Sequence, residues 1–430
     1  MKKLLLLCCV LLMMGAALAQ DDAPAALVVN AETAIGEVSE YVLGANFGPL
    51  NTIPVDLLEA AQNSGINYLR FPGGRWGDLN NIQPQQIDMF IRICNLVGAE
   101  PSISMRLENG TPEQAAELVR YTNIEKGYNV RYWSIGNEPN LFDDYTTEDH
   151  NTQWRAIAEA MLEVDPDIIL IGPDTSQYSG NPATDPRDPE GRDWVREFLL
   201  ANGDLVDIVA VHRYPFPRSM ANPLTTIDDL RLNAPEWSRI LPALRAVIEE
   251  TTGRTDLPVA VTEANSHWSA NQQGEATPDS HYNAVWWADV LGRLISDQPF
   301  IVNYFDMQSA ARRGAWGLLE VYNVRPTYYT YQIYQRFGTT LVESESPDDD
   351  VRVYAALRED GALTLVIVNM LLEEQTRTLN LNGFDAGGAA DYWLLDPEHN
   401  AAEMEPVELR DGVVLALPAQ SVSLFILPPA

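Results

Sequence analysis

Cysteine and histidine are both scarce in this sequence. Its 430 residues include three cysteines and five histidines, and Cys8 and Cys9 lie in the N-terminal leader-like segment. Removal of that segment would leave Cys94 alone, which excludes an intrachain disulfide. Cys94 continues an apolar helical pattern that begins at Ile87, so we expect a buried structural thiol rather than a nucleophile. The histidines form no cluster at metal-ligand spacing, so the sequence predicts neither a metal site nor a cofactor.

Positive charge is scarce as well. The 28 lysines and arginines are outnumbered by 61 aspartates and glutamates, which gives a formal net charge of −33. Phosphate binding needs clustered cations, so we expect neither nucleic acid nor an anionic membrane as a partner. With 46% hydrophobic and 21% charged residues, the composition is that of a folded globular protein, long enough for two domains. No oligomeric state is indicated.

Residues 1–20 have the features of a secretory signal peptide. Lys2 and Lys3 precede a leucine-rich run that ends in small residues, so cleavage is expected after Ala19. The apolar run is too short for a stable membrane span, and the leucine before Cys8 departs from a lipoprotein signal. We therefore expect a protein that is secreted, either outside the cell or into a periplasm.

From Tyr41 onward, short apolar runs alternate with amphipathic helical patterns. Residues 111–114 (Thr-Pro-Glu-Gln) form a capping box with proline at the first helical position, and the helical spacing after Trp237 continues through Pro242. Eight strands that alternate with helices predict a (β/α)8 barrel. The strands are expected at 41–47, 67–71, 101–106, 131–137, 167–172, 206–213, 258–263 and 299–306.

After Gly338 the pattern changes to one of period two. Residues 346–350 (Ser-Pro-Asp-Asp-Asp) are expected to form a linker, and apolar residues then alternate from Val351 onward. Turn dipeptides punctuate this segment at 360–361, 382–383 and 411–412. The C-terminal region is therefore predicted to be a β-sandwich domain, with its boundary at about residue 341.

Two glutamates end predicted strands. The stretch 131–140 (Arg-Tyr-Trp-Ser-Ile-Gly-Asn-Glu-Pro-Asn) places Glu138 at a strand tip, because Pro139 prevents further pairing. Glu263 ends the run that begins at Pro258. A barrel with about 40 residues in each βα unit would place the two glutamates three strands apart, across the barrel mouth. Two opposed carboxylates are what glycoside hydrolysis requires, so a carbohydrate substrate is indicated.

The Gly-Asn-Glu-Pro sequence at 136–139, together with Glu263, resembles glycoside hydrolase clan A, whose members are retaining enzymes built on a (β/α)8 barrel. The resemblance implies that Glu138 is the general acid/base, that Glu263 is the nucleophile, and that Asn137 forms a hydrogen bond with the sugar 2-hydroxyl. It also implies that the N-terminal strands, at 21–40, join the C-terminal β-domain beside a catalytic barrel at 41–340.

The same resemblance assigns roles to other strand tips. Arg70 and Tyr214 would donate hydrogen bonds to the nucleophile, and His212 would line the pocket. An adjacent guanidinium is expected to keep Glu263 ionised, although a barrel-mouth salt bridge would look the same in the sequence. Trp76, Trp268 and Trp316 are candidate platforms for sugar stacking or ordinary core residues. Arg75, Arg213, Arg312 and Arg313 are expected in top loops, where they would bind a uronate carboxylate or pair with nearby acids.

We expect a double-displacement mechanism, with a dry pocket and the charge of Glu263 raising the pKa of Glu138. The sugar is left open by the motifs. Residues 70–74 (Arg-Phe-Pro-Gly-Gly) resemble the α-L-arabinofuranosidase family, whereas residues 135–140 and 262–266 resemble the heparanase/β-glucuronidase and β-xylosidase/iduronidase families. A catalytically inactive carbohydrate-binding barrel and a metal-dependent barrel hydrolase are the rival functions.

Overall fold

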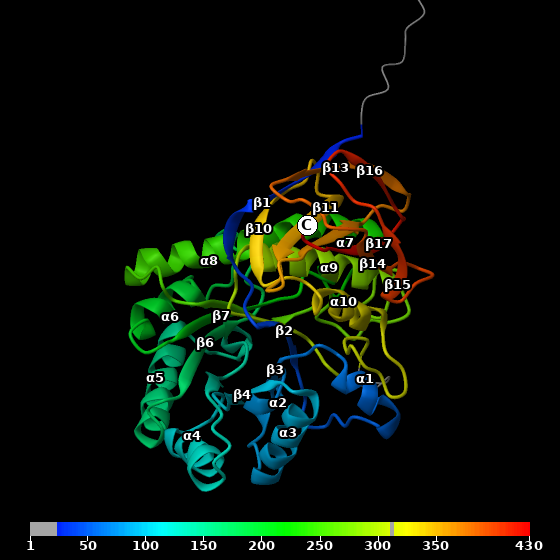
Figure 1. The fold of residues 1–430 in the computed structure, drawn as a ribbon. Coiled ribbons are helices and arrows are strands. Elements are labelled where there is room, and N and C mark those ends of the chain that lie inside the picture. The colour runs from blue at the N-terminus through cyan, green and yellow to red at the C-terminus, as the bar shows by residue number, and fades with distance from the viewer. Residues whose placement is uncertain (1–23, 310–313) are drawn as a thin grey trace, which may run out of the picture.

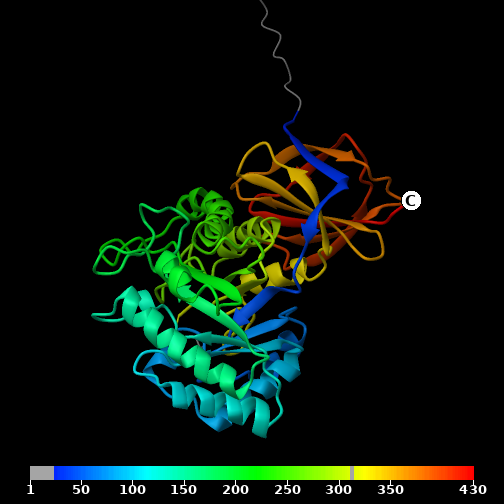
Figure 2. The same cartoon turned by 90° about the vertical axis from the view of Figure 1, so that its left-hand side faces the viewer.

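The computed structural model describes residues 24–309 and 314–430, which form a barrel and an adjoining curled β-sheet (Figures 1 and 2). The predicted signal peptide, with Cys8 and Cys9, and the predicted pocket residues Arg312 and Arg313 lie outside this described part. Among the described residues, no helix has both the length and the apolar character needed to cross a membrane.

Eight parallel strands close into a barrel, as the sequence predicts. The N-terminal ends of the strands are closed by an aromatic cluster. In it, Tyr41, Tyr68 and Tyr132 contact one another with ring centroids 5.3 to 5.6 Å apart. These large side chains fill the bottom of the barrel, so its other end carries the site. The strands are β2 (Tyr41–Asn46), β3 (Tyr68–Phe71), β4 (Glu100–Met105), β5 (Tyr132–Ile135), β6 (Ile169–Thr175), β7 (Ile208–Arg213), β8 (Val259–Ala264) and β9 (Ile301–Tyr304).

Helices surround the barrel, and three of them carry features that the sequence predicts. Thr111 accepts a hydrogen bond from the backbone N–H of Gln114, Pro242 lies inside α8, and Cys94 is a buried free thiol on α3. The helices are α1 (Leu58–Gln62), α2 (Trp76–Leu79), α3 (Pro84–Val97), α4 (Pro112–Val119), α5 (Thr147–Val164), α6 (Trp194–Asn202), α7 (Ile227–Asn233), α8 (Trp237–Thr252), α9 (His281–Ser296) and α10 (Pro326–Tyr334).

Nine strands form one sheet in the order β15-β14-β17-β12-β11-β10-β1-β13-β16, and this sheet curls around its own apolar core. The N-terminal strand β1 pairs with β10 and β13, which confirms that the N-terminal segment joins the β-domain. The strands are β1 (Ala26–Glu37), β10 (Thr340–Glu345), β11 (Val351–Leu357), β12 (Leu363–Asn369), β13 (Gln375–Asn382), β14 (Ala390–Leu395), β15 (Ala402–Val407), β16 (Val413–Leu417) and β17 (Ser421–Leu427).

Residues 346–350 are not the predicted linker between domains. They connect β10 to β11 inside the sheet, because strand β10 already begins at Thr340 and pairs with β11. Their aspartates are held by arginines: Asp348 lies 3.0 Å from Arg377, and Asp349 lies 3.0 Å from Arg293 of α9. An acidic, proline-containing segment of this kind resembles a linker in sequence. Here, however, ion pairs hold it to both the β-sheet and the barrel helix α9.

Candidate active site

The predicted site residues come together at the C-terminal ends of the barrel strands. Arg70 lies in β3, His212 in β7 and Glu263 in β8, while Glu138 follows β5. His212 and Glu263 are register partners on neighbouring parallel strands, so their side chains leave the barrel wall side by side. Tyr214, one residue beyond β7, is buried at the same mouth.

The backbone around Glu138 is shaped to present its carboxylate. Gly136 has a φ of 83°, and a Cβ at this position would lie 2.7 Å from Leu107. Glu138 itself adopts the left-handed conformation, with a φ of 55°, and donates its backbone N–H to the carbonyl of Asp174 at 3.1 Å. A non-glycine residue in this region costs free energy, and such residues are concentrated at functional sites.

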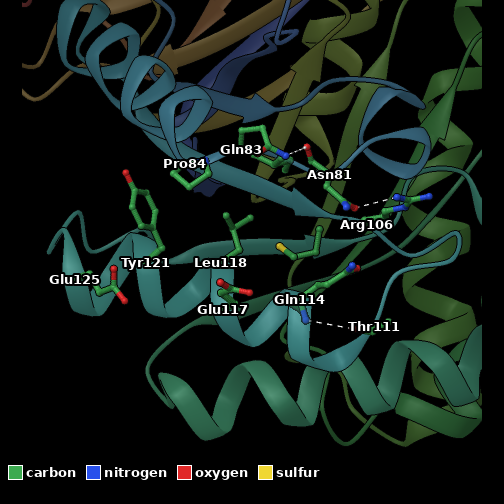
Figure 3. Close-up of a pocket in the computed structure, with 13 residues that line it drawn as sticks. Asn81, Gln83, Pro84, Arg106, Thr111, Gln114, Glu117, Leu118, Tyr121 and Glu125 are labelled. Atoms are coloured by element: carbon green, nitrogen blue, oxygen red, sulfur yellow. Dashed lines mark hydrogen bonds between the residues drawn. The ribbon is translucent and has the colours of Figure 1, made fainter.

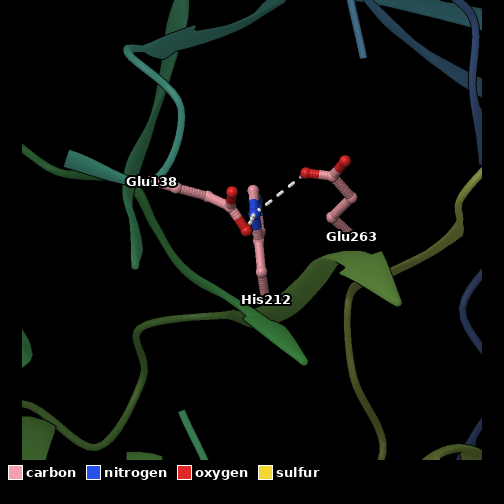
Figure 4. A group of neighbouring side chains, drawn as sticks. All are labelled: Glu138, His212 and Glu263. Atoms are coloured by element: carbon pink, nitrogen blue, oxygen red, sulfur yellow. Dashed lines mark hydrogen bonds and ion pairs between the residues drawn. The ribbon is translucent and has the colours of Figure 1, made fainter. Parts of the chain in front are cut away.

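His212 lies between the two carboxylates (Figure 4). Its Nδ1 is 3.3 Å from Glu138 Oε1 and 3.0 Å from Glu263 Oε2. One oxygen from each glutamate and this nitrogen all lie within 4.8 Å of one another. The barrel therefore brings together two glutamates that are 125 positions apart in the sequence, as their places at strand ends predict.

A buried charge network underlies these groups. Arg70 is fully buried and donates to Asn137 Oδ1 at 3.1 Å and to Asp174 Oδ2 at 3.2 Å. Its Nη1 is 3.9 Å from Glu263 Oε2. Asp174 also accepts a hydrogen bond from the Thr262 hydroxyl and lies 3.5 Å from His212 Nε2. Arg70 and Asp174 thus connect Glu263 to the backbone segment that carries Asn137 and Glu138.

Two aspartates of this site were missed by the sequence analysis. Asp174 lies two residues past the predicted end of its strand, and a carboxylate at a strand tip is the signal that could have found it. Asp78, on α2, accepts hydrogen bonds from the backbone N–H groups of Leu107 and Asn137, both at 2.8 Å. Asp78 therefore holds the strand-tip loop that carries Asn137 and Glu138.

The electrostatics differ from one expectation. Burial alone would raise the pKa of Glu138, but the hydrogen bond and positive charge of His212 outweigh it and lower that pKa below its usual value. The expected rise is therefore wrong for the free protein. Burial alone would lower the pKa of His212, but Glu263, Asp174 and Glu138 together raise it well above the ordinary histidine value.

The neighbouring groups show the same balance of burial and charge. Burial alone would raise the pKa of Asp174, but Arg70 and His212 hold it below its usual range. For the Tyr214 phenol, burial and then the charges of Glu263 and Glu138 raise the pKa well above the ordinary tyrosine value. Tyr214 is therefore a neutral hydrogen-bond donor beside the two carboxylates.

A cavity of about 850 Å³ opens above this group. Trp268 and Trp316 line it together with Glu138, Tyr214 and Glu263. Each indole is fixed by its N–H, which donates to Pro217 O at 2.7 Å in Trp268 and to His267 O at 2.8 Å in Trp316. Trp268 as a whole residue is 40% exposed.

Other predicted pocket residues have different positions. Trp76 does not belong to the lining of this cavity, and Arg75 pairs with Glu108 at 3.2 Å. Arg213 does line the cavity, but Glu236 holds it at 2.6 Å. The local-pairing alternative is thus the observed one for both arginines.

A second cavity, of about 330 Å³, lies between α4 and the segment that leads into α3 (Figure 3). Its lining includes Gln83, Arg106, Glu117 and Glu125, with Tyr121 as the aromatic member. This cavity contains none of the predicted site residues, so the larger cavity is the candidate active site.

No protein-family model matches the chain. Part of its sequence is similar to curated α-L-arabinofuranosidases. The probable α-L-arabinofuranosidase C of Aspergillus niger is 26% identical over 174 residues, which are 30% of this chain and 34% of that protein. The α-L-arabinofuranosidase C of Emericella nidulans is 27% identical over 157 residues, or 27% and 31% of the two chains. The match thus spans about a third of these relatives' length.

Solved structures share the fold along almost the whole chain. A bifunctional glucanase-xylanase, CelM2, from a metagenome library has a TM-score of 0.74 at 18% identity and covers 95% of this chain and 99% of its own. An α-L-arabinofuranosidase of Thermotoga maritima has a TM-score of 0.73 at 18% identity, with 94% and 99% covered. A family 44 xyloglucanase of Paenibacillus polymyxa has a TM-score of 0.74 at 14% identity, with 94% and 100% covered.

Fold and sequence together confirm the resemblance to the clan A glycoside hydrolases. The barrel with its β-domain is the fold of this class. Within it, the relatives found by sequence support the likeness to the α-L-arabinofuranosidase family.

Proposed function

We propose that this protein is a retaining glycoside hydrolase in which Glu138 is the acid/base and Glu263 the nucleophile. The spacing of the two carboxylates carries the proposal, because oxygens of both lie within 4.8 Å of each other. Retaining enzymes place their carboxyl groups about 5 to 5.5 Å apart, whereas inverting enzymes need about 6.5 to 9.5 Å to admit a water molecule.

The first step needs a proton on Glu138. In the proposed sequence, the His212 Nδ1 proton moves across 3.3 Å to Glu138 Oε1 when a sugar fills the cavity and displaces water. Glu138 then gives this proton to the glycosidic oxygen while Glu263 attacks the anomeric carbon, and the bond to the leaving group breaks. This route accounts for an acid whose pKa is low in the free protein.

The second step reverses these roles. Ionised Glu138 removes a proton from water, the hydroxide attacks the anomeric carbon, and the bond to Glu263 breaks. The proton then returns to His212, so the protein regains its starting state. Arg70 and Tyr214 hold Glu263 in place for the attack. Asn137 Nδ2 is buried and makes no hydrogen bond within residues 24–309 and 314–430, so it is the donor we assign to the sugar 2-hydroxyl.

For the substrate, we propose glycans of the plant type or glycans that contain uronates. The names of the relatives make α-L-arabinofuranosides the first sugar to test, followed by xylan and xyloglucan. The partly exposed Trp268 would stack its ring on the apolar face of a sugar. Arg218 and Arg239 line the same cavity with 70% and 47% of their side-chain surface exposed. Arg218 pairs with Asp229 at 3.3 Å and Arg239 lies 3.9 Å from Glu236, so a uronate carboxylate would compete with these acids for the two guanidinium groups. We also propose that the protein is secreted after cleavage at Ala19.

A direct experiment measures sugar release from aryl arabinofuranoside, xyloside, glucuronide and glucoside and from the corresponding polymers. The wild-type protein is compared with Glu263→Ala and with Glu117→Ala, which removes an exposed acid from the other cavity. We expect release by the wild type and by Glu117→Ala, with none by Glu263→Ala. If folded wild-type protein binds these sugars in calorimetry and releases none, the inactive carbohydrate-binding barrel replaces this proposal.

A further inference from the structure

Three groups at the barrel mouth have the spacing of metal ligands. His212 Nδ1 lies 3.3 Å from Glu138 Oε1 and 3.0 Å from Glu263 Oε2. Bonds of about 2.0 to 2.1 Å from Zn²⁺ to nitrogen or oxygen place neighbouring ligands of a tetrahedral site about 3.3 Å apart. The two separations from His212 Nδ1 match this spacing. The two glutamate oxygens, which lie within 4.8 Å of each other, would have to approach to about 3.3 Å around one ion. Because the ligands come from three strands, their spacing in sequence gave no sign of the site.

A second observation concerns buried polar atoms. Glu263 Oε2 is buried, and apart from His212 Nδ1 at 3.0 Å and Arg70 Nη1 at 3.9 Å it has no polar partner among the described residues. His212 Nε2 makes no hydrogen bond to any described residue and has Asp174 Oδ1 behind it at 3.5 Å. A carboxylate behind a histidine is the usual support of a metal ligand, because it orients the ring and makes the coordinating nitrogen more basic.

The local charge also suits a divalent cation. Glu138, Asp174 and Glu263 contribute three carboxylates to the cluster, and Arg70 contributes its only permanently positive group among the described residues. With a neutral His212, the cluster would carry two negative charges, which a divalent ion would balance. Imidazole nitrogen favours Zn²⁺ or Cu²⁺ over Mg²⁺ and Ca²⁺, which prefer six or more oxygen ligands.

We propose that Glu138, His212 and Glu263 form a site for Zn²⁺, with the fourth ligand position open to the cavity, and that an ion bound there inhibits the protein. The ion takes the place of the proton on Nδ1 and occupies both carboxylates, so neither attack on a sugar nor proton transfer is possible. The inhibition rests on the proposed glycosidase function, whereas the binding of the ion does not.

The binding test uses calorimetric titration of Zn²⁺ into chelator-treated protein, with Mg²⁺ as the comparison ion. We expect one Zn²⁺ site, at least tenfold weaker Mg²⁺ binding, and at least a tenfold loss of Zn²⁺ affinity in both His212→Asn and Glu138→Gln. The matched control is His399→Asn, which removes another histidine–carboxylate pair, 2.9 Å from Asp396, far along the chain in the β-domain. Thermal unfolding verifies that each variant is folded. Absent Zn²⁺ binding, or binding unchanged in Glu138→Gln, overturns the site.

The inhibition test follows hydrolysis in the presence of Zn²⁺ and then of excess chelator. We expect inhibition that competes with substrate and is reversed by the chelator. If the chelator abolishes hydrolysis and Zn²⁺ restores it, the inhibitory role is overturned in favour of a metal-dependent hydrolase. If the metal-free protein hydrolyses nothing while Zn²⁺ still binds as expected, the proposed glycosidase function fails and the metal site stands.

Discussion

Replacing Asp174 by alanine tests the buried network under the two glutamates. Its carboxylate lies 3.2 Å from Arg70 Nη2 and 3.5 Å from His212 Nε2, and it accepts the Thr262 hydroxyl. Arg70 and Asp174 have 0% and 1% of their side-chain surface exposed. Removing one partner of such a buried pair leaves an uncompensated charge and costs about 3 to 5 kcal/mol.

We therefore expect Asp174→Ala to lower the free energy of unfolding by about 3 to 5 kcal/mol in urea titrations that monitor fluorescence and circular dichroism. The control is Glu250→Ala, which breaks the exposed pair with Arg196 at 2.7 Å and should change the free energy of unfolding very little. Asp174→Asn should fall between the two, because the amide keeps an acceptor for Thr262 and loses the charge. A loss below about 1 kcal/mol for Asp174→Ala would refute the assigned network.

Three further predictions concern catalysis, acid stability and binding. Glu138→Gln should lower kcat by about 10²- to 10⁴-fold on substrates with poor leaving groups and much less on activated aryl glycosides, which need little acid help; equal losses on both classes would contradict the acid role. His150 is buried among aromatic rings, and burial lowers its pKa from 6.5 to about 3. The unfolded chain therefore binds the extra proton below pH 6.5, and stability falls as the pH drops from 6.5 towards 3. His150→Phe should remove about 1.4 kcal/mol per pH unit of that loss in urea titrations at pH 4 to 6, and unchanged slopes would contradict this assignment. Trp268→Ala should raise KM for polymers with little change in kcat, whereas an unchanged KM would exclude stacking on its ring.

Most of the barrel could be predicted from the apolar runs and the helical spacing in the sequence. Each predicted barrel strand overlaps an observed one, because buried parallel strands are apolar runs bounded by polar loops. The pairing of Glu138 with Glu263 followed from the same periodicity, since parallel strands in a barrel bring all their C-terminal ends to one mouth. Strand order and strand ends thus specified which residues meet.

The parts that failed depend on side-chain contacts across the fold. The roles of Asp78 and Asp174 depend on which N–H groups and cations they contact, and the strand pattern shows none of these contacts. Only the position of Asp174, two residues past a predicted strand end, carries a signal in the sequence. The direction of the Glu138 pKa was wrong because the position of His212 between the carboxylates decides it. The linker at 346–350 was misassigned because its ion pairs come from distant arginines.

The stereochemistry of the first product tests the proposed retaining mechanism most directly, and proton nuclear magnetic resonance can follow it during hydrolysis of an aryl glycoside. Because oxygens of Glu138 and Glu263 lie within 4.8 Å of each other, we expect the first sugar released to keep the anomeric configuration of the substrate. We expect no sugar release by Glu263→Ala. A first product of inverted configuration, or full activity in the Glu263→Ala protein, would show that Glu263 is not the nucleophile of a retaining enzyme.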